Sequence, residues 1–390
     1  MANRYNRLVG QMLEHVEHKG TDEAEGVMRV PSSNYTDPAR WQREMDLVFK
    51  RLPVLAGLSV EIPQPGDFKT IDMLGMPLLV TRARDGSVRV MLNVCSHRAM
   101  TLTTEPCGHR KLFTCPYHSW SFDGEGNLRG IADAEKFGDV DKSQLGLTQL
   151  PAYERGGLIF TVLDPAAQDV DFDAFLGGMI EDIEEKHFDK WYYCGQRTMA
   201  GANWKVAYDG YLEGYHFAAA HPETIHPRSY SNIMQFEAFG PHVMIGFPQR
   251  SIDKLREVPE EQWWQHENDG YDFVRTIFPN VSIFVAPEIT SVSQLIPGPT
   301  VNENRTIVYF LHKEHPADEQ GAAELTQMVD WLAGVIDRED YQVGLQVQRG
   351  LESGAHREVV FGRNERGNQY FHRWLEYYLA DDPDAPVPQL

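Results

Sequence analysis

The sequence predicts an α+β protein in which an all-β domain precedes a domain whose antiparallel sheet wraps around a long C-terminal helix. Three observations predict this class. Short β-like segments separated by turn residues occupy the chain from about residue 53 to residue 165. Longer strand-like segments follow between residues 242 and 313, and apolar residues at helical spacing then run from about Pro316 to Ser353. The predicted parts are therefore 1–52, 53–165 and 166–390.

The N-terminal part, residues 1–52, is expected to be helical. Its clearest helix begins after Asp37, because an aspartate is a good helix cap and Pro38 suits the first helical position. Trp41, Met45 and Val48 then fall on one face of this helix. These helices are expected to pack on the C-terminal part.

The strands and helices of the other two parts are read from their periodicity. In the all-β part the clearest strands are "PLLVTRA", "VRVMLNV", "KLFTCPY" and "SWSFD", separated by turns such as "RDGS" and "DGEGN". In the third part, residues 171–190 predict a helix and residues 203–221 a longer one. The strands that follow are "HVMIGF", "VSIFVA", "SVSQLI" and "RTIVYFLHK".

Composition excludes several classes of function. The formal net charge is −21, with 57 acidic and 36 basic side chains, so the chain lacks the basic surface that nucleic-acid binding requires. No apolar run approaches the roughly 20 residues that span a bilayer, and the N-terminus lacks the apolar core of a signal peptide. Four cysteines in 390 residues do not form a disulfide framework. A cytoplasmic location is expected, with the cysteines free for metal binding or catalysis.

The first chemical motif is Cys-x-His followed, after seventeen residues, by Cys-x-x-His. It comprises Cys95, His97, Cys115 and His118, and a hairpin of this length brings its two loops together. Two thiolates and two imidazoles suit a zinc site. They also suit a two-iron, two-sulfide cluster in which the thiolates bind one iron and the imidazoles bind the other. The simplest alternative is four unrelated buried residues.

The order Cys-x-His and then Cys-Pro-Tyr-His-Ser-Trp resembles the Rieske family. The resemblance implies a Rieske-type [2Fe-2S] cluster that transfers electrons. Cys95 and Cys115 would bind the iron that stays ferric, and His97 and His118 the iron that is reduced. No site role is expected for the remaining Cys107, His109 and Cys194.

The second motif lies in the long helix predicted at 203–221. Glu213 and His216 are three residues apart and share a helical face, but His216 and His221 are five apart and diverge by about 140° on an ideal helix. A metal bound by both histidines therefore requires a distortion, which Pro222 favours by discouraging helix at the preceding residue. Taken alone, such histidines are more often packed in a core.

This stretch resembles the catalytic helix of Rieske non-heme iron oxygenases, in which an Asn-Trp-Lys element precedes Asp-x-x-His-x-x-x-x-His. The resemblance identifies His216 and His221 as ligands of a mononuclear Fe(II). A carboxylate is expected to complete the site and leave positions open for dioxygen. The candidates on the C-terminal helix are Asp337, Glu339 and Asp340. The resemblance to the family, which here extends to an acidic pair followed by Gln-Arg-Gly-Leu, points to Asp340.

Two positions depart from the family pattern. Glu213 stands where the family usually has the aspartate that bridges a Rieske histidine of one subunit to an iron histidine of its neighbour. A glutamate retains the carboxylate, so we expect Glu213 to keep the bridging role. Asp209 stands where the family often has asparagine, and it is expected either to tune the iron or the pocket or to cap local backbone.

The resemblance also implies the fold and the partners of the chain. It implies the catalytic (alpha) subunit of an aromatic-ring-hydroxylating oxygenase with a helix-grip (START-like) catalytic domain. Three subunits would be arranged head to tail, with or without a small beta subunit. The glycine run "DGEGNLRG" misses the dinucleotide-binding spacing. Electrons from NAD(P)H would therefore come through a separate reductase, with or without a ferredoxin, and an acidic surface suits a basic carrier.

The sequence indicates the identity of the substrate less clearly than it indicates the metal sites. Phe217, Phe236, Phe247 and Phe284 are candidates for a pocket that holds a small aromatic or alicyclic substrate beside dioxygen, although each also suits a core. The reaction would be hydroxylation, cis-dihydroxylation or oxidative demethylation. One alternative is a monooxygenase acting on a quaternary ammonium compound held by cation–π attraction. Another, without catalysis, is an electron carrier fused to a domain that binds a hydrophobic ligand.

Overall fold

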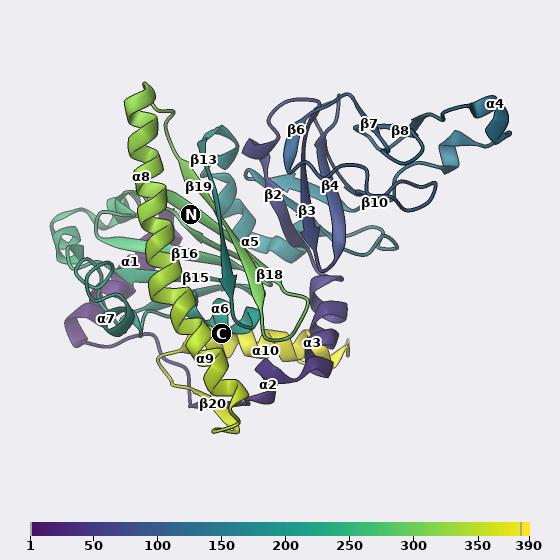
Figure 1. Ribbon diagram of the computed structural model, residues 1–390. Helices are drawn as coiled ribbons and strands as arrows, with labels where there is room; N and C mark the ends of the chain where they lie inside the picture. The colour runs from purple at the N-terminus through teal and green to yellow at the C-terminus, as the bar shows by residue number, and fades with distance from the viewer. Residues whose placement is uncertain (1, 383) are drawn as a thin grey trace. The chain divides into compact units, whose positions relative to one another are not determined.

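The structure is a computed structural model that describes residues 2–382 and 384–390, and its chain forms two compact units (Figure 1). Unit 1 comprises Met1–Val48, Leu176–Asp182 and Trp191–Leu390, and unit 2 comprises Phe49–Phe175 and Ile183–Lys190. The division into parts at residues 52 and 165 stays a prediction. Within the described residues, no helix combines the length and the apolar composition that a membrane span requires.

Unit 2 is built from three small antiparallel sheets. The four strands predicted from the sequence are present, and their alternating apolar residues form one core that also contains Cys95 and Cys115. The first sheet consists, in spatial order, of β10 (Gln149–Leu150), β5 (Val88–Leu92), β4 (Met76–Arg82), β3 (Asp67–Met73) and β6 (Cys107–His109). The second consists of β11 (Ala152–Arg155), β12 (Leu158–Thr161) and β2 (Val54–Leu58). The third consists of β7 (Leu112–Thr114), β8 (Ser121–Asp123) and β9 (Leu128–Gly130).

Unit 1 contains a seven-stranded antiparallel sheet. Strands β14 to β19 follow one another as neighbours, and β13 pairs with β19 to form the far edge. The four strands predicted for this part are β15, β17, β18 and β19. In spatial order the sheet consists of β13 (Tyr192–Gly201), β19 (Asn304–His312), β18 (Thr290–Pro297), β17 (Val281–Phe284), β16 (Tyr271–Ile277), β15 (His242–Pro248) and β14 (Gln235–Phe239).

The long C-terminal helix crosses one face of this sheet (Figure 1). It consists of α8 (Glu319–Val335), the π-helical turn η7 (Ile336–Tyr341) and α9 (Gln342–Glu352). Asp318 caps its start by accepting the Gly321 N–H, and its buried apolar face packs on the sheet. The predicted α+β class, with an antiparallel sheet around a long helix, is therefore confirmed.

The continuous helix predicted at 203–221 is wrong. The chain forms α6 (Trp204–Gly210), then a turn, and then the single helical turn α7 (Phe217–Ala220). The Glu213 side chain accepts the backbone N–H groups of Tyr215 and His216. These groups are therefore not donated to carbonyls of a preceding helical turn, and the helix cannot continue.

The N-terminal segment is helical as predicted, except for one strand. Asp37 caps α3 by accepting the Ala39 N–H. The strand β1 was not predicted, because its pairing partner β20 lies more than 300 residues later in the chain. The elements of this segment are α1 (Ala2–His18), β1 (Met28–Pro31), α2 (Ser33–Thr36), α3 (Pro38–Glu44) and the π-helical turn η1 (Met45–Phe49). Near the C-terminus lie β20 (Glu358–Phe361) and then α10 (Arg366–Ala380).

Short helices make up most of the other connections. α5 (Phe172–Glu184) corresponds to the helix predicted at 171–190, but it ends before residue 190. α4 (Ala134–Phe137) follows β9 in unit 2. The 3-10 turns are η2 (Ser59–Glu61), η3 (Lys142–Gln144), η4 (Phe188–Lys190), η5 (Ile252–Glu257) and η6 (Glu260–His266).

The Asn-Trp-Lys element anchors α6 in the core of unit 1. The Asn203 side chain caps the helix by accepting the Lys205 N–H. The Trp204 indole donates to Glu44 Oε2, and the Lys205 ammonium pairs with the same carboxylate. Both charged side chains of the Lys205–Glu44 pair are fully buried. Arg40 pairs with the other Glu44 oxygen.

Replacing Lys205 by methionine tests this anchor. Lys205→Met is expected to lower the free energy of unfolding by about 3 kcal/mol, because it leaves the Glu44 charge buried with fewer partners. Denaturant unfolding followed by tryptophan fluorescence measures the loss. The control is the double variant Lys205→Met/Glu44→Gln, which removes the buried charge and should recover part of the stability. A Lys205→Met protein as stable as the wild type would contradict this account.

Candidate functional site

The four residues of the first motif lie on two loops of unit 2 that have the same backbone shape. The N–H of the residue four places after each cysteine, Ala99 and Ser119, donates to the carbonyl of that cysteine. Both of these residues have a φ of +58°, which turns the chain back toward the strand. In each loop the cysteine N–H donates to the carbonyl five residues later, so both cysteines sit in matching tight turns.

These loops bring the two histidines together above the buried cysteines. Cys95 and Cys115 are buried, whereas His97 and His118 are half-buried, with their ring centroids 4.6 Å apart. Trp120 stacks on His97 at 4.7 Å with an interplanar angle of 9°. The imidazoles thus face outward from a thiol pair that lies in the core.

This set of donors fits a [2Fe-2S] cluster. Burial raises the pKa of the Cys95 thiol, and the neighbouring Cys115 thiol raises it further. A metal is therefore needed to stabilise the thiolates in this setting. Two buried thiols beside two outward imidazoles match the unequal iron environments of a Rieske-type cluster.

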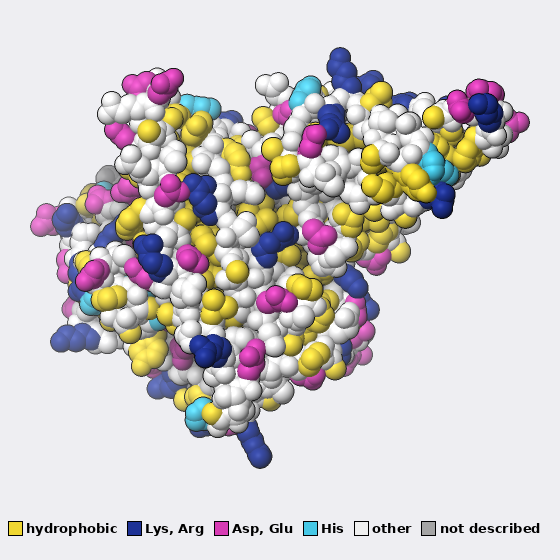
Figure 2. Space-filling view, in the orientation of Figure 1, with side chains coloured by type: hydrophobic (Ala, Val, Ile, Leu, Met, Phe, Trp, Pro, Cys, Tyr) yellow, Lys and Arg dark blue, Asp and Glu magenta, His cyan; other side chains and the backbone are white. Residues whose placement is uncertain are grey.

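Hydrophobic side chains gather on the surface of unit 2 around these loops (Figure 2). Phe137 is exposed, and its ring contacts both His97 and Trp120 edge-on at 5.5 and 5.3 Å. We call this surface the cluster patch, and its exposed apolar residues are Met100, Leu112, Tyr117, Phe137 and Val140.

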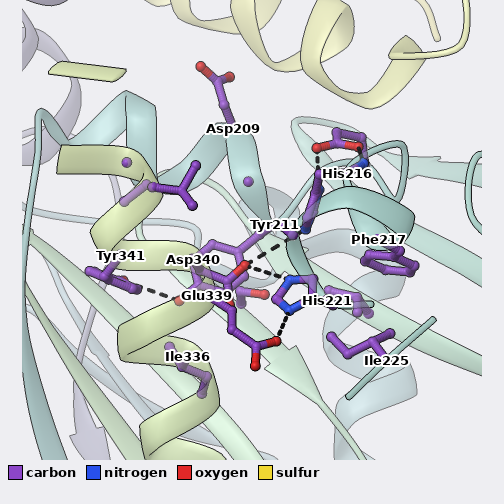
Figure 3. Close-up of a pocket in the computed structure, with 18 of the residues that line it drawn as sticks. Asp209, Tyr211, His216, Phe217, His221, Ile225, Ile336, Glu339, Asp340 and Tyr341 are labelled. Atoms are coloured by element: carbon purple, nitrogen blue, oxygen red, sulfur yellow. Dashed lines mark hydrogen bonds and ion pairs between the residues drawn. The ribbon is translucent and has the colours of Figure 1, made fainter. Parts of the chain in front are cut away.

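The second group of candidate ligands lies in unit 1. One ligand atom from each of His216, His221 and Asp340 lies within 4.8 Å of the others. His216 and His221 flank the single turn α7, so the distortion expected between them is provided by the broken helix. Asp340 comes from the π-helical turn η7. Figure 3 shows the three side chains converging.

The Nδ1 atom of each histidine contacts a different glutamate, whereas both Nε2 atoms face Asp340. His221 Nδ1 lies 2.7 Å from Glu339 Oε2, and its Nε2 lies 3.0 Å from Asp340 Oδ1. His216 Nδ1 pairs with Glu213, and its Nε2 lies 3.7 Å from Asp340 Oδ1. Because a carboxylate only accepts, Glu213 and Glu339 each favour a proton on the Nδ1 atom that they contact. Both Nε2 atoms face Asp340, where a bound metal ion would take the place of a proton on Nε2.

Hydrogen bonds within this site also shift the pKa values of His221 and Glu339. Burial lowers the pKa of His221, but the hydrogen bonds and charges of Asp340 and Glu339 outweigh burial and raise that pKa above its usual value. Burial raises the pKa of Glu339, whereas hydrogen bonds from Thr224 and His221 bring it below the usual value. With Glu339 ionised, His221 is held in one orientation.

The π-helical turn explains how two consecutive residues reach the same imidazole. Glu339 and Asp340 contact opposite nitrogens of His221, and the wider turn gives both side chains access to it. Of the three ligand candidates on the C-terminal helix, Asp340 lies at the histidines and Glu339 lies behind His221. Asp337 is not among the described residues that line the cavity.

The Glu213 carboxylate is held mainly by groups of the two nearby residues Tyr215 and His216. Its Oε2 accepts two backbone N–H groups and its Oε1 accepts the His216 Nδ1–H. A carboxylate oxygen has two lone pairs, so Oε1 retains one acceptor site in the described residues.

Asp209 points away from the two histidines (Figure 3). Its carboxylate accepts the Tyr35 hydroxyl at 2.7 Å and contacts His372 Nε2 at 3.1 Å, while Asn368 donates to its backbone carbonyl at 2.9 Å. His372 is fully buried. Asp209 therefore belongs to a hydrogen-bonded cluster beside the histidine site, and a catalytic role for it stays a prediction.

A cavity of about 810 Å³ opens onto both histidines and Asp340. Phe217, Phe247 and Phe284 line it as predicted, and Ile225 and Ile336 add to its apolar wall. Phe236 is instead buried against Gly367 and is not among the cavity-lining residues. The lining of the same cavity also includes Tyr35, Asp209, Glu213, Val343, Val360 and Glu365, and we call this part of the lining the acidic groove.

The remaining cysteines and His109 lie elsewhere. Cys107 is exposed on β6, His109 pairs with Asp67, and Cys194 is half-buried on β13. Sequence reasoning missed the contacts of Glu339, Tyr35 and His372 with the site residues. A carboxylate directly before Asp340 was a usable signal for Glu339, whereas Tyr35 and His372 are distant in sequence and carried none.

Two family models match the chain. The Rieske [2Fe-2S] domain matches residues 53–153, which include the cysteine–histidine loops. The model for the ring hydroxylating alpha subunit (catalytic domain) matches residues 188–381, which include His216, His221 and Asp340. The chain is a Rieske oxygenase. Its cofactors are a [2Fe-2S] cluster and a mononuclear non-heme iron, and it is the terminal oxygenase that receives electrons from a redox partner.

Known relatives of this oxygenase match nearly its whole length. The carnitine monooxygenase oxygenase subunit of Escherichia coli (strain K12) is 28% identical over 370 residues, which cover 90% of this chain and 94% of the relative. The chloroplastic choline monooxygenase of Spinacia oleracea is 27% identical, covering 90% and 78%. The crystal structure of the quaternary ammonium Rieske monooxygenase CntA with an inhibitor has the same fold, with a TM-score of 0.77, 22% identity and coverage of 92% and 96%.

Glu339 provides a test of how the histidine site of this oxygenase is held. Glu339→Gln is expected to weaken ferrous-iron binding by about ten- to a hundredfold, because an amide holds the His221 tautomer less firmly than a carboxylate. Competition with a metal chelator measures the affinity. Thr224→Val, which removes only the hydroxyl that supports Glu339, should have a smaller effect. Unchanged iron affinity in Glu339→Gln would count against the orienting role.

Proposed function

We propose that His216, His221 and Asp340 hold the mononuclear iron and that Cys95, His97, Cys115 and His118 hold the cluster. The observation that carries the proposal is the orientation of the histidines. Both Nε2 atoms turn toward Asp340 while both Nδ1 atoms are held by carboxylates. Two imidazoles and one carboxylate form the facial triad of non-heme iron oxygenases, which leaves positions open for dioxygen.

The surrounding residues prepare the site for oxidation of a small organic molecule. When bound, the iron supplies the activation of dioxygen, and the cluster supplies single electrons. Glu339 and Glu213 keep the Nδ1 protons in place, and the apolar wall that includes Phe217 and Phe247 holds the substrate and excludes water.

The preferred substrate class is a small aromatic or alicyclic molecule. A volume of about 810 Å³ with an aromatic and aliphatic wall suits a ring that stacks on phenylalanine side chains. The expected reaction is hydroxylation, cis-dihydroxylation or oxidative demethylation of that molecule.

A quaternary ammonium substrate is the second candidate. The rings of Phe217 and Phe247 lie 5.2 Å apart on the cavity wall, close enough for both to contact one ammonium group by cation–π attraction. The likeness to a carnitine monooxygenase oxygenase subunit supports this candidate.

The oxygenase is further proposed to act as a head-to-tail trimer, with or without a small beta subunit. In this arrangement the cluster patch of one copy docks on the acidic groove of the next. The groove presents Asp209, Glu213 and Glu365, whose charges complement Arg98 beside the half-buried His118. The spare acceptor site on Glu213 Oε1 would take the N–H of a cluster histidine from the neighbouring copy.

Electrons are proposed to reach the cluster from NAD(P)H through a separate reductase, with or without a ferredoxin. A net charge of −21 favours a carrier with a basic surface, since opposite charges speed the encounter of two proteins.

The first test separates the two metal sites. His216→Ala is expected to abolish substrate oxidation because the iron loses a ligand, while the visible spectrum of the cluster stays unchanged. His312→Ala, which removes a half-buried histidine at the end of β19, serves as the control and should keep both properties. Product formation by an iron-depleted His216→Ala protein would show that the ligand assignment is wrong.

The second test addresses electron transfer between copies. A cluster-deficient variant, Cys115→Ser, and an iron-deficient variant, His216→Ala, are each expected to be inactive alone. Co-expressed in equal amounts, the two variants should together recover about a quarter of wild-type turnover, because about three quarters of the randomly assembled trimers are mixed and each mixed ring has one intact pair of neighbouring sites out of three. Adding Glu213→Ala to both variants should abolish the recovery. Mixed trimers that stay inactive would contradict transfer between copies.

A further inference from the structure

One basic side chain stands out among the described residues that line the cavity. Arg228 is the only lysine or arginine among the described residues that line it. The other charged groups on the lining are carboxylates, apart from the two histidines. Glu339 and Asp340 belong to the histidine site, Asp209, Glu213 and Glu365 line the acidic groove, and the remaining two are Asp272 and the exposed Glu288. Away from the histidine site, an anionic group that enters the cavity is repelled by these carboxylates, and Arg228 is the one side chain of the described lining that attracts it.

The position of Arg228 is set by its backbone and by Asp272. Its N–H donates to the Ile225 carbonyl at 3.0 Å, and its own carbonyl accepts the Arg250 N–H at 2.8 Å. Its Nη2 donates to Asp272 Oδ1 at 2.9 Å. Asp272 is buried on β16, and the same oxygen accepts Gln249 and Asn268 side chains at 3.0 Å each. The guanidinium is therefore anchored at one end by a carboxylate that two further side chains, Gln249 and Asn268, hold in place.

The rest of the guanidinium has no partner in the described part of the chain. The contacts of Arg228 all run through Nη2, which leaves the Nε and Nη1 donors unused. A guanidinium stays charged at any physiological pH and presents paired donors that match the two oxygens of a carboxylate. Its side chain is 41% exposed, so these donors remain accessible.

The wall beside Arg228 is apolar. Val274 lies two residues after Asp272 on β16 and points to the same face of the sheet, where it lines the cavity with Phe247 and Phe284. A molecule held here would have an apolar body against these side chains and a polar end at Arg228.

We propose that Arg228 binds a carboxylate of the substrate, so that this oxygenase acts on small organic acids whose apolar part faces the histidine site. This inference rests on the proposed function, because it places the substrate in the cavity beside His216, His221 and Asp340. Arg228 is then a specificity-determining residue, and Asp272 positions it.

Calorimetric titration of the holoenzyme with matched neutral and anionic probes tests the proposal without turnover. The probes are benzoate against benzamide, and cyclohexanecarboxylate against cyclohexanecarboxamide. Each carboxylate is expected to bind at least about tenfold more tightly than its amide, because the charged pair with a guanidinium is stronger than a neutral hydrogen bond. Arg228→Gln should abolish this preference. Amides that bind as well as the carboxylates, or carboxylates that do not bind, would overturn the proposal.

Two further variants exclude indirect effects. Arg228→Gln leaves Asp272 without its cation, and that carboxylate alone would repel an anion. The double variant Arg228→Gln/Asp272→Asn removes this repulsion and is still expected to show no preference for carboxylates; a restored preference would overturn the role of Arg228. Arg250→Gln, which changes a neighbouring arginine that is bound to His226 and does not line the cavity, should retain the wild-type preference.

Oxygen consumption measured with the same probes tests the proposed function independently. Arg228-dependent binding of carboxylates without any oxidation would uphold the inference and count against the proposed function. Oxidation of neutral probes at equal rates in the wild type and in Arg228→Gln would uphold the proposed function and overturn the inference.

Discussion

The catalytic arrangement depends on two hydrogen bonds from imidazole Nδ1 atoms to carboxylates. Glu213 holds His216 and Glu339 holds His221, and each leaves the Nε2 atom of its histidine facing Asp340. Without these two contacts either ring is free to rotate or to adopt the other tautomer, and the three ligand atoms would not converge. The broken helix and the π-helical turn are best understood as the backbone shapes that bring these carboxylates within reach.

Glu213 links the local backbone to the site. Its side chain takes the N–H groups of Tyr215 and His216, which ends the helical course after α6, and it also holds the His216 ring. The same residue thus sets the direction of the chain and the orientation of a ligand. A carboxylate is required at this position because no other side chain accepts from both backbone donors and an imidazole at once.

Much of the fold was predictable because periodicity reports which face of an element is buried. The strands at β4, β5, β15, β18 and β19 and the helix from Glu319 to Glu352 follow from alternation and from spacing of three and four. The break between α6 and α7 was missed because Leu212, Phe217 and their neighbours keep an apolar pattern that a continuous helix would share. The pairing of β1 with β20 was missed because nothing local to either strand identifies so distant a partner.

The sequence by itself determined which kinds of ligand are present and how they are grouped. The two Cys-His pairs, the two histidines five residues apart and the acidic pair before Gln-Arg-Gly-Leu are local patterns, and local spacing constrains the metals that they suit. Only the tertiary structure decided that Glu339 stands behind His221, that Asp209 joins Tyr35 and His372, and that Arg228 is the one basic side chain among the described residues of the cavity wall. The contacts of Glu339 with His221 and of Asp209 with Tyr35 and His372 join residues from 118 to 174 positions apart, and only the packing of the tertiary structure brings such residues together.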